Sequence, residues 1–280
     1  MFGYRHGFHA GNFADVFKHT ILVQLLSALR KKDKPFYVLD THGGAGRYDL
    51  RSAEARKVGE YKEGIGRLWE QTILEPEIAD YLELVARFNQ DGALKTYPGS
   101  PRIIQSLLRD QDRLEVCEFH PREHPLLAAE MSDSRQVKVL LEDAYKALKA
   151  RIPPRESRGL VFMDPSFEMS GEFDRLQQAV ELLQKRWRHG MVAIWYPILD
   201  REPSARFHKA ILKLNIDSLL CTELGVSPYD SPRGMHGCGM IIVNPPWQLD
   251  IALQRILPQL QSLLAVEGAG QHRVEWFKRS

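Results

Sequence analysis

The feature that most constrains the fold is a series of seven short segments rich in β-branched and aromatic residues, separated by longer segments with helical periodicity. Most of them are continuous apolar runs, typical of strands covered on both faces in a parallel sheet. They are residues 35–40, 113–119, 137–141, 160–164, 190–196, 217–223 and 239–243. The helical patterns include residues 13–31, 121–131, 171–188 and 248–264. This alternation predicts an α/β fold with a doubly wound, mostly parallel, seven-stranded sheet and helices on both faces.

Two segments depart from the alternation. Residues 51–98 carry helical periodicity and no convincing strand, although they fall between the first two predicted strands. We expect them to form a small helical subdomain inserted into a main domain of residues 1–50 and 99–280. Residues 225–238 have the Gly, Pro and Asp of a long loop and leave no room for a crossover helix. The last two strands are therefore expected to form a hairpin.

Composition limits the class of protein. The chain lacks an apolar run near the ~20 residues of a membrane span, and its first residues lack the apolar core of a signal peptide. We therefore expect a soluble, cytoplasmic protein with no membrane partner. The three cysteines, Cys117, Cys221 and Cys238, are scattered, which argues against a disulfide framework or a zinc site. A net charge of +2 is too small to establish a nucleic-acid partner by itself.

A glycine-rich turn follows the first predicted strand, in the sequence LDTHGGAGRY of residues 39–48. An acidic residue, Asp40, precedes Gly43, Gly44 and Gly46, which let the backbone pass close to a ligand. The turn is not a phosphate-binding Walker loop, because it lacks the Lys-Ser/Thr pair. An ordinary strand-to-helix connection would contain the same glycines. The residues at the ends of the neighbouring strands are therefore needed to distinguish a ligand-binding turn from such a connection.

Acidic residues also end the next two strands. Glu118 follows the second strand, where a carboxylate can accept hydrogen bonds from two ribose hydroxyls. Asp143 follows the third and can bind an exocyclic amine, while the Ala144 amide reaches a ring nitrogen. Acidic groups at three successive strand ends favour an adenosine-containing cofactor across this edge of the sheet. Asp143 could equally cap the helix that follows.

The fourth strand ends in VFMDPSFE, residues 161–168. An Asp-Pro pair often simply opens a turn. The sharper hypothesis is an active site, in which the Asp164 carboxylate and the Pro165 carbonyl accept hydrogen bonds from an exocyclic amine and make it a better nucleophile. Phe167 would then stack on the nucleobase, which is worth ~1–3 kcal/mol per stacked base.

Taken in this order, the features resemble the class I S-adenosylmethionine-dependent amino-methyltransferases. Their motif [DNS]-P-P-[YFW] is matched at residues 164–167, except that Ser166 replaces the second Pro. Residues 4–20, 39–50 and 97–101 are similar to those of the RlmJ family of 23S rRNA adenine-N6 methyltransferases, and the similarity extends over essentially the whole chain. It implies a monomeric enzyme that uses S-adenosylmethionine to methylate one adenine of 23S rRNA, adenine 2030, in protein-free RNA.

The resemblance also implies roles for individual residues. Its cofactor contacts fall on His19, His42, Ser100, Glu118, Asp143, Ala144 and Asp164. Asp164 is also the catalytic residue, with Pro165 and Phe167 beside it. Tyr4, His6 and Lys18 match an N-terminal motif that closes near the target adenine and binds the substrate. No metal is expected, because the His6-x-x-His9 pair lacks a third ligand with convincing spacing.

Competing interpretations stay open at this stage. The tetrapeptide Asn244-Pro245-Pro246-Trp247 matches the methyltransferase motif at all four positions, more closely than residues 164–167 do. It follows the seventh strand, however, whereas the motif should follow the fourth. We therefore interpret it as a strand exit with Trp247 packed on the core. DNA adenine or protein glutamine methylation would use the same tetrapeptide chemistry. A non-catalytic nucleic-acid-binding protein could instead bind phosphates through the basic and aromatic residues of the N-terminus, 51–62 and 183–190.

Overall fold

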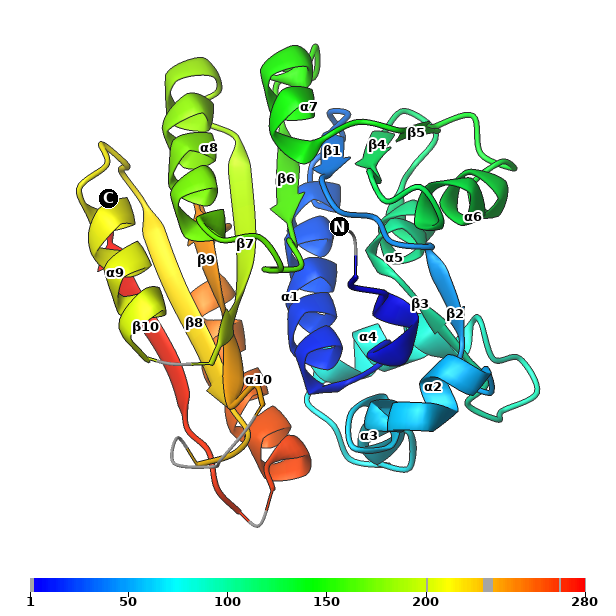
Figure 1. Cartoon of the computed structure of the whole chain (residues 1–280). Helices are drawn as coiled ribbons and strands as arrows, with labels where there is room; N and C mark the ends of the chain where they lie inside the picture. The colour runs from blue at the N-terminus through cyan, green and yellow to red at the C-terminus, as the bar shows by residue number, and fades with distance from the viewer. Residues whose placement is uncertain (1–2, 200, 229–233, 267, 280) are drawn as a thin grey trace.

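The computed structural model describes residues 3–199, 201–228, 234–266 and 268–279. Eight strands within these residues form one sheet in the order β10-β8-β9-β7-β6-β1-β4-β5, and β2 pairs with β3 in a separate ribbon (Figure 1). The strands are β1 (Tyr37–Asp40), β2 (Arg47–Asp49), β3 (Thr96–Pro98), β4 (Arg113–Cys117), β5 (Val137–Leu140), β6 (Gly159–Met163), β7 (Met191–Ile198), β8 (Leu219–Gly225), β9 (Gly237–Val243) and β10 (His272–Lys278).

The strand directions place a switch point between β1 and β6. From β1 the chain continues into β4 and β5 on one side, and it then crosses to β6 and β7 on the other. These five strands are parallel, whereas β9, β8 and β10 add on in antiparallel pairs. Open α/β sheets bind ligands outside the carboxyl ends of their strands at such a point.

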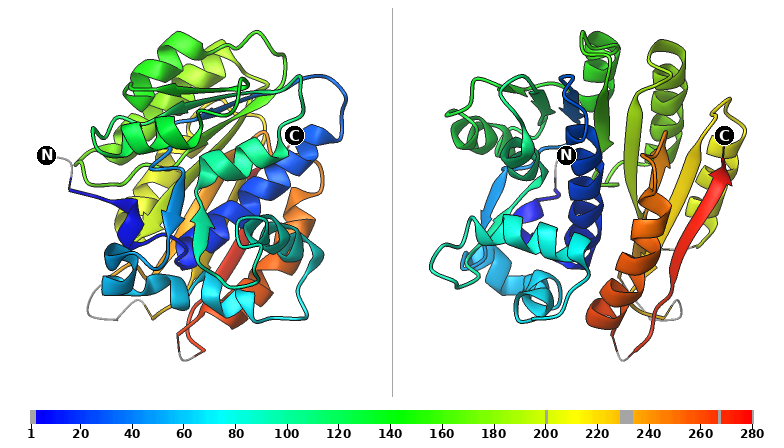
Figure 2. Two further views of the ribbon diagram at one scale, coloured as in Figure 1. Left: turned by 90° about the vertical axis from the view of Figure 1, so that its right-hand side faces the viewer. Right: turned by 180° about the vertical axis from the view of Figure 1, so that it is seen from behind.

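Helices cover both faces of the sheet. The longer ones are α1 (Phe13–Arg30), α4 (Pro76–Ala86), α5 (Ser100–Leu107), α6 (Glu123–Glu130), α7 (Ala144–Arg151), α8 (Glu172–Arg186), α9 (Arg201–Leu212) and α10 (Leu249–Leu264). Core residues of α1, α5 and α10 pack on one face, and those of α7, α8 and α9 pack on the other. Seen from behind, α1 and α10 lie on the near side of the sheet (Figure 2).

Helix α1 is the most central helix. Asn12 caps its first turn by accepting a hydrogen bond from the Asp15 backbone N–H at 3.0 Å. Buried residues occur all around the helix, because it packs between the sheet and the helices α4, α5 and α10. Polar side chains of α1 that reach the carboxyl edge of the sheet, Asp15, Lys18 and His19, are therefore buried.

All seven predicted strands are present, and β8 and β9 pair in the antiparallel manner expected of a hairpin, although residues 229–233 of their connection lie outside the described residues. The predicted number of strands was wrong, because β10 adds an eighth. Its sequence HRVEWFK mixes charged and apolar residues, since an edge strand buries only part of its surface.

Short helices follow β2: α2 (Ala53–Val58), η2 (Glu60–Lys62) and α3 (Ile65–Trp69), and α4 comes after them. The expectation of no strand in residues 51–98 was wrong at β3, which pairs with β2. Helix α4 packs on α1 and α10, and α3 packs on α10. Arg67 Nη1 donates to the carbonyl of Leu263 in the last turn of α10 at 3.2 Å and to that of Ala265 directly after it at 3.1 Å.

Candidate active site

Four acidic residues meet at the carboxyl edge of the parallel strands. Asp40 ends β1, Glu118 follows β4, Asp143 follows β5 and Asp164 follows β6. Because β5, β4, β1 and β6 are parallel neighbours in this order, their carboxyl ends share one edge. The predicted convergence of these residues is therefore a feature of the fold.

The glycine turn after β1 bonds directly to Glu118. The Gly44 backbone N–H donates to Glu118 Oε2 at 2.7 Å, and the His120 N–H donates to Oε1 at 2.6 Å. Gly44 has a φ of 58°, and a Cβ there would lie 2.1 Å from the Tyr48 hydroxyl, so only glycine fits. Burial raises the pKa of Glu118 to about 7, although these two hydrogen bonds oppose the shift.

Asp40 is one of the three acidic strand ends that the sequence pointed to, but no contact with the cofactor was predicted for it. Its side chain is fully buried, and its Oδ2 has no hydrogen-bond partner among the described residues. Burial raises the pKa of Asp40 to about 7, although hydrogen bonds from Ser100 and the His42 backbone N–H oppose the shift. A buried acceptor without a donor is costly, so this edge of the sheet suits a ligand that carries an N–H or ammonium group.

Asp143 caps helix α7, as the capping interpretation predicted. Its Oδ1 accepts hydrogen bonds from the backbone N–H groups of Tyr145 and Lys146, both at 3.1 Å. Arg175 Nη2 lies 2.9 Å from Asp143 Oδ2. Ala144 is the first residue of α7 and is buried at the same edge of the sheet.

Asp164 forms an ion pair with a buried lysine of α1. Lys18 Nζ lies 2.5 Å from Asp164 Oδ2 and 2.7 Å from Asp15 Oδ1. Burial would lower the pKa of Lys18, but the charges of Asp15 and Asp164 hold it well above its usual value. Asp15 was missed by sequence analysis. Its position one turn before Lys18 on α1 was the available signal.

The N-terminal residues lie over this ion pair. The Tyr4 hydroxyl is 2.8 Å from His6 Nδ1, and His6 Nε2 is 2.9 Å from Asp15 Oδ2. The Gly3 N–H donates to Glu168 Oε1 at 3.1 Å, which ties the N-terminal segment to the loop after Asp164. The structure thus brings together the three predicted substrate residues and the predicted catalytic residue.

The two predicted histidines of the site are held as neutral rings. Burial lowers the pKa of His19 to about 3 and that of His42 to about 4. His19 Nδ1 is 2.7 Å from the Tyr97 hydroxyl, which in turn lies 2.8 Å from the Tyr81 hydroxyl. This buried chain fixes the orientation of the His19 ring.

Phe167 lies in an aromatic cluster beside Asp164. Its ring centroid is 4.9 Å from that of Phe173 and 6.0 Å from that of Trp195. Phe167 is half-buried and has a φ of 53°, in the left-handed region that side chains other than Asn and Asp seldom adopt. Such backbone strain is concentrated at functional sites. Lys18 Nζ lies 5.7 Å from the Trp195 ring centroid, so this cluster borders the ion pair.

The competing tetrapeptide lies at the opposite end of the sheet. Strand β9 runs antiparallel to β7, and Val243 pairs with Val192 at the amino end of β7. The prediction that Trp247 packs on the core was wrong, because its side chain is 84% exposed. Asn244, with a φ of 52°, turns the chain outward, and its Nδ2 donates to the Arg188 and Gly190 carbonyls at 2.8 Å each.

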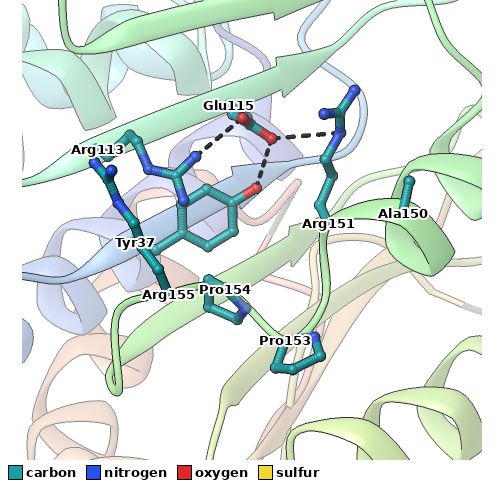
Figure 3. Close-up of a pocket in the computed structure, with 8 residues that line it drawn as sticks. All are labelled: Tyr37, Arg113, Glu115, Ala150, Arg151, Pro153, Pro154 and Arg155. Carbon is teal, nitrogen blue, oxygen red and sulfur yellow. Dashed lines mark hydrogen bonds and ion pairs between the residues drawn. The ribbon is translucent and has the colours of Figure 1, made fainter.

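A pocket also opens at the amino ends of β1 and β4 (Figure 3). Its cations are already paired: Arg113 and Arg151 both contact Glu115, at 3.0 and 3.5 Å. The Tyr37 hydroxyl donates to the same carboxylate at 3.0 Å. Arg155 is also paired, with Glu156 at 3.0 Å, so each arginine already has a carboxylate partner and we assign no ligand to this pocket.

One group of potential metal ligands occurs among the described residues. His208, Cys221 and Glu223 each place one ligand atom within 4.8 Å of the others. The Tyr196 hydroxyl lies 2.9 Å from His208 Nε2, 3.5 Å from Cys221 Sγ and 2.8 Å from Glu223 Oε1. This hydroxyl satisfies the polar atoms of the group, which joins α9 to the outer strands.

The sheet order, the glycine turn and the acidic strand ends define a Rossmann-like methyltransferase fold. A family model described as "Ribosomal RNA large subunit methyltransferase D, RlmJ" matches residues 33–278. The chain belongs to this family. No helix in the described parts of the chain is long and apolar enough to cross a membrane.

Full-length relatives and a solved structure agree with the family. The chain is 45% identical over 278 residues to "Ribosomal RNA large subunit methyltransferase J" of Haemophilus influenzae and 43% identical over 277 residues to the protein of the same name from Escherichia coli. Each match covers 99% of both chains. The crystal structure of protein LPL1258 from Legionella pneumophila has a TM-score of 0.89 and 35% identity, and the match covers 95% of this chain and 98% of that one.

Proposed function

We propose that this enzyme transfers the methyl group of S-adenosylmethionine to N6 of one adenine in protein-free 23S rRNA, adenine 2030 in the family. The observation that carries the proposal is the position of Asp164, which follows β6 at the switch point, next to the glycine turn of β1. The family and its relatives, named as rRNA large-subunit methyltransferases, support the reaction and the kind of RNA.

The residues of the carboxyl edge fit the cofactor. Glu118 accepts hydrogen bonds from the ribose hydroxyls, while Asp143 and Ala144 bind the adenine. The unpartnered Oδ2 of Asp40 accepts from the amino group of the methionine part. His19, His42, Ser100 and Asp164 complete the binding site. When bound, the cofactor supplies a methyl group activated by its sulfonium.

Asp164 and Pro165 prepare the adenine amine. The Asp164 carboxylate and the Pro165 carbonyl accept its two N–H groups, which draws the nitrogen lone pair out of the ring and towards the methyl carbon. The cofactor would supply the methyl carbon and leave as a neutral thioether, and the methylated nitrogen would lose one proton to solvent. Phe167 stacks on the base. Lys18 positions the Asp164 carboxylate, since its ammonium is held between Asp15 and Asp164.

We assign RNA binding to the segments that flank this edge. Tyr4, His6 and Lys18 belong to a segment that contacts the target adenosine. Residues 51–98 form an inserted helical subdomain, and its exposed cations Arg51, Arg56 and Lys57 bind phosphates. We further infer that the enzyme acts as a cytoplasmic monomer. Its three free, buried cysteines fit a reducing compartment.

Methylation of defined nucleic acids tests the proposal. Purified enzyme and labelled S-adenosylmethionine are incubated with protein-free 23S rRNA, 16S rRNA or duplex DNA, and the methylated nucleoside is identified by mass spectrometry. We expect N6-methyladenosine in 23S rRNA alone, at one position. Label in DNA would favour a DNA adenine methyltransferase, and cofactor binding without any transfer would contradict the catalytic role of Asp164.

A further inference from the structure

Trp247 is presented to solvent on a rigid loop. At 84% exposure it is the most exposed large apolar side chain among the described residues, and Ile251, one turn later on α10, is 46% exposed. Asn244 anchors the loop: its backbone N–H donates to the Ser218 carbonyl at 3.0 Å, and its side chain bonds to two further carbonyls. Pro245 and Pro246 fix φ in the next two residues. Little conformational entropy is therefore lost if a ligand binds Trp247.

Cations gather at the same end of the sheet. Strand β9 ends where β7 begins, and β10 ends beside the first residue of β8, as the pairs Val192–Val243, Leu219–Val243 and Leu219–Lys278 show. The exposed residues Lys185, Arg186 and Arg188 precede β7, while Lys278 ends β10 and Arg279 follows it at the same end of the sheet. Asn244, in the Trp247 loop, donates hydrogen bonds to the backbone carbonyls of Arg188 and Gly190, in the segment that carries the cations before β7.

The acidic groups at this end neutralise only part of that charge. Asp217 pairs with Arg188 at 2.7 Å, and Asp250 lies 3.8 Å from Arg279. Lys185 carries no ion pair among the described residues and is exposed. Trp247 is thus an exposed aromatic ring beside a surface with excess positive charge.

We propose that Trp247 stacks on an unpaired base of the RNA substrate, with the neighbouring phosphates held by the cations that precede β7. An exposed aromatic ring next to a cationic surface is how proteins bind single-stranded RNA without regard to sequence. The charge favours RNA over a second copy of this chain, whose same surface would carry the same positive charge. This assignment rests on the proposed function for the identity of the substrate.

Trp247 and the cations beside it lie far from the methyl-transfer site. Strand β7 has 8 residues and spans roughly 25 Å, with Asp164 near the carboxyl edge and Trp247 beyond the amino edge. An RNA that reaches both ends is bound at two places. An RNA that fills only the catalytic site gains nothing from Trp247.

The test uses oligouridylate, which has no adenine and therefore reports binding without methylation. Its Kd is measured by fluorescence anisotropy of a labelled strand at several salt concentrations, for the full chain and for Trp247→Ala, Trp247→Phe and Lys185→Gln. The matched control is Ile73→Ala, because Ile73 is an equally exposed apolar residue on another part of the surface, at 83%. Melting temperatures confirm that each variant is folded.

We expect Trp247→Ala to raise the Kd about 5- to 150-fold, the loss of one stacked base. Trp247→Phe should retain most of the affinity, Lys185→Gln should weaken binding and reduce its salt dependence, and Ile73→Ala should change nothing. An unchanged Kd for Trp247→Ala overturns the proposal. So does a dimer in sedimentation that Trp247→Ala dissociates while RNA binding persists. Methyl transfer to 23S rRNA is measured separately, so a failure of the proposed function gives a different result.

Discussion

Lys18 Nζ lies 2.5 Å from Asp164 Oδ2, and both side chains are largely buried. The same ammonium lies 2.7 Å from Asp15 Oδ1, so one cation holds two carboxylates. Asp15 is further fixed by the Gly11 backbone N–H at 2.7 Å and by His6 at 2.9 Å. Although burial opposes it, the charges of His6 and Lys18 hold the pKa of Asp15 well below its usual value. The position of Asp164 is thus set by α1 as well as by β6.

The first prediction concerns the Asp164 carboxylate, the proposed hydrogen-bond acceptor for the exocyclic amine of the target adenine. Asp164→Asn should slow methyl transfer about 100- to 1,000-fold, comparable to removal of one transition-state hydrogen bond in other enzymes. Asp174→Asn, an exposed residue on α8, is the matched control and should keep full activity. Single-turnover methylation of 23S rRNA at saturating cofactor measures both. Near-normal transfer by Asp164→Asn would contradict the site assignment.

The second prediction concerns the energetic coupling between Lys18 and Asp164. Lys18→Met leaves two carboxylates without their shared cation, and loss of one partner of a buried ion pair costs ~3–5 kcal/mol of unfolding free energy. Adding Asp164→Asn should restore part of that loss, because it removes one of the uncompensated charges. Urea denaturation of the single and double variants measures the coupling. If the two substitutions act additively, Lys18 and Asp164 are not coupled. Exposed Lys57→Met serves as the control.

The third prediction concerns pH. Burial raises the pKa values of Asp40 and Glu118 to about 7. Donors on the cofactor favour the ionised carboxylates and lower both pKa values, so binding releases protons. Cofactor affinity should therefore rise as the pH increases to about 7 and then level off. Calorimetry in buffers of different ionisation enthalpy measures the protons released, and Glu118→Gln should reduce that number. Proton uptake on binding would contradict the assignment.

The fourth prediction concerns phosphate contacts of the inserted helices. Arg51, Arg56 and Lys57 are exposed, and Arg51 is held by Asp49, with its Nε 2.9 Å from Oδ1. Replacing the three cations with Gln should reduce the slope of log affinity against log salt by roughly 2, at ~0.7 per contact with single-stranded RNA. The charge-matched control replaces Lys138, Lys149 and Lys209. Equal slopes for both triple variants would show that residues 51–62 do not contact RNA.

Sequence patterns predicted the part of the site that depends on strand order. Glu118, Asp143 and Asp164 each follow a parallel strand, and parallel strands bring their carboxyl ends to one edge whatever the details of packing. Strand β10 escaped prediction, because its mixed polar pattern is what an edge position requires. The isolation of Asp40 Oδ2 could not be predicted, since it depends on which donors the folded chain brings near it.

The exposure of Trp247 was mispredicted for a related reason. Large aromatic residues after a buried strand usually continue into the core. Here the direction of the chain after Val243 is set by the Asn244 side chain, which bonds to carbonyls more than fifty residues away in sequence. Long-range contacts of this kind carry no local signal. The same limit applies to the ion pair of Lys18 with Asp164.

The last prediction sets the two tetrapeptides against each other. Asn244→Ala removes two hydrogen bonds at ~1 kcal/mol each and leaves a non-Asn residue at a φ of 52°. It should lower the unfolding free energy by about 2–3 kcal/mol and leave methyl transfer per folded molecule unchanged at saturating RNA. Phe167→Ala should instead slow methyl transfer and leave the fold largely intact, because its ring is only half-buried and is proposed to stack on the base. Melting temperature and single-turnover methylation on the same RNA distinguish the two. A stable, inactive Asn244→Ala beside an active Phe167→Ala would place the chemistry at the end of β9.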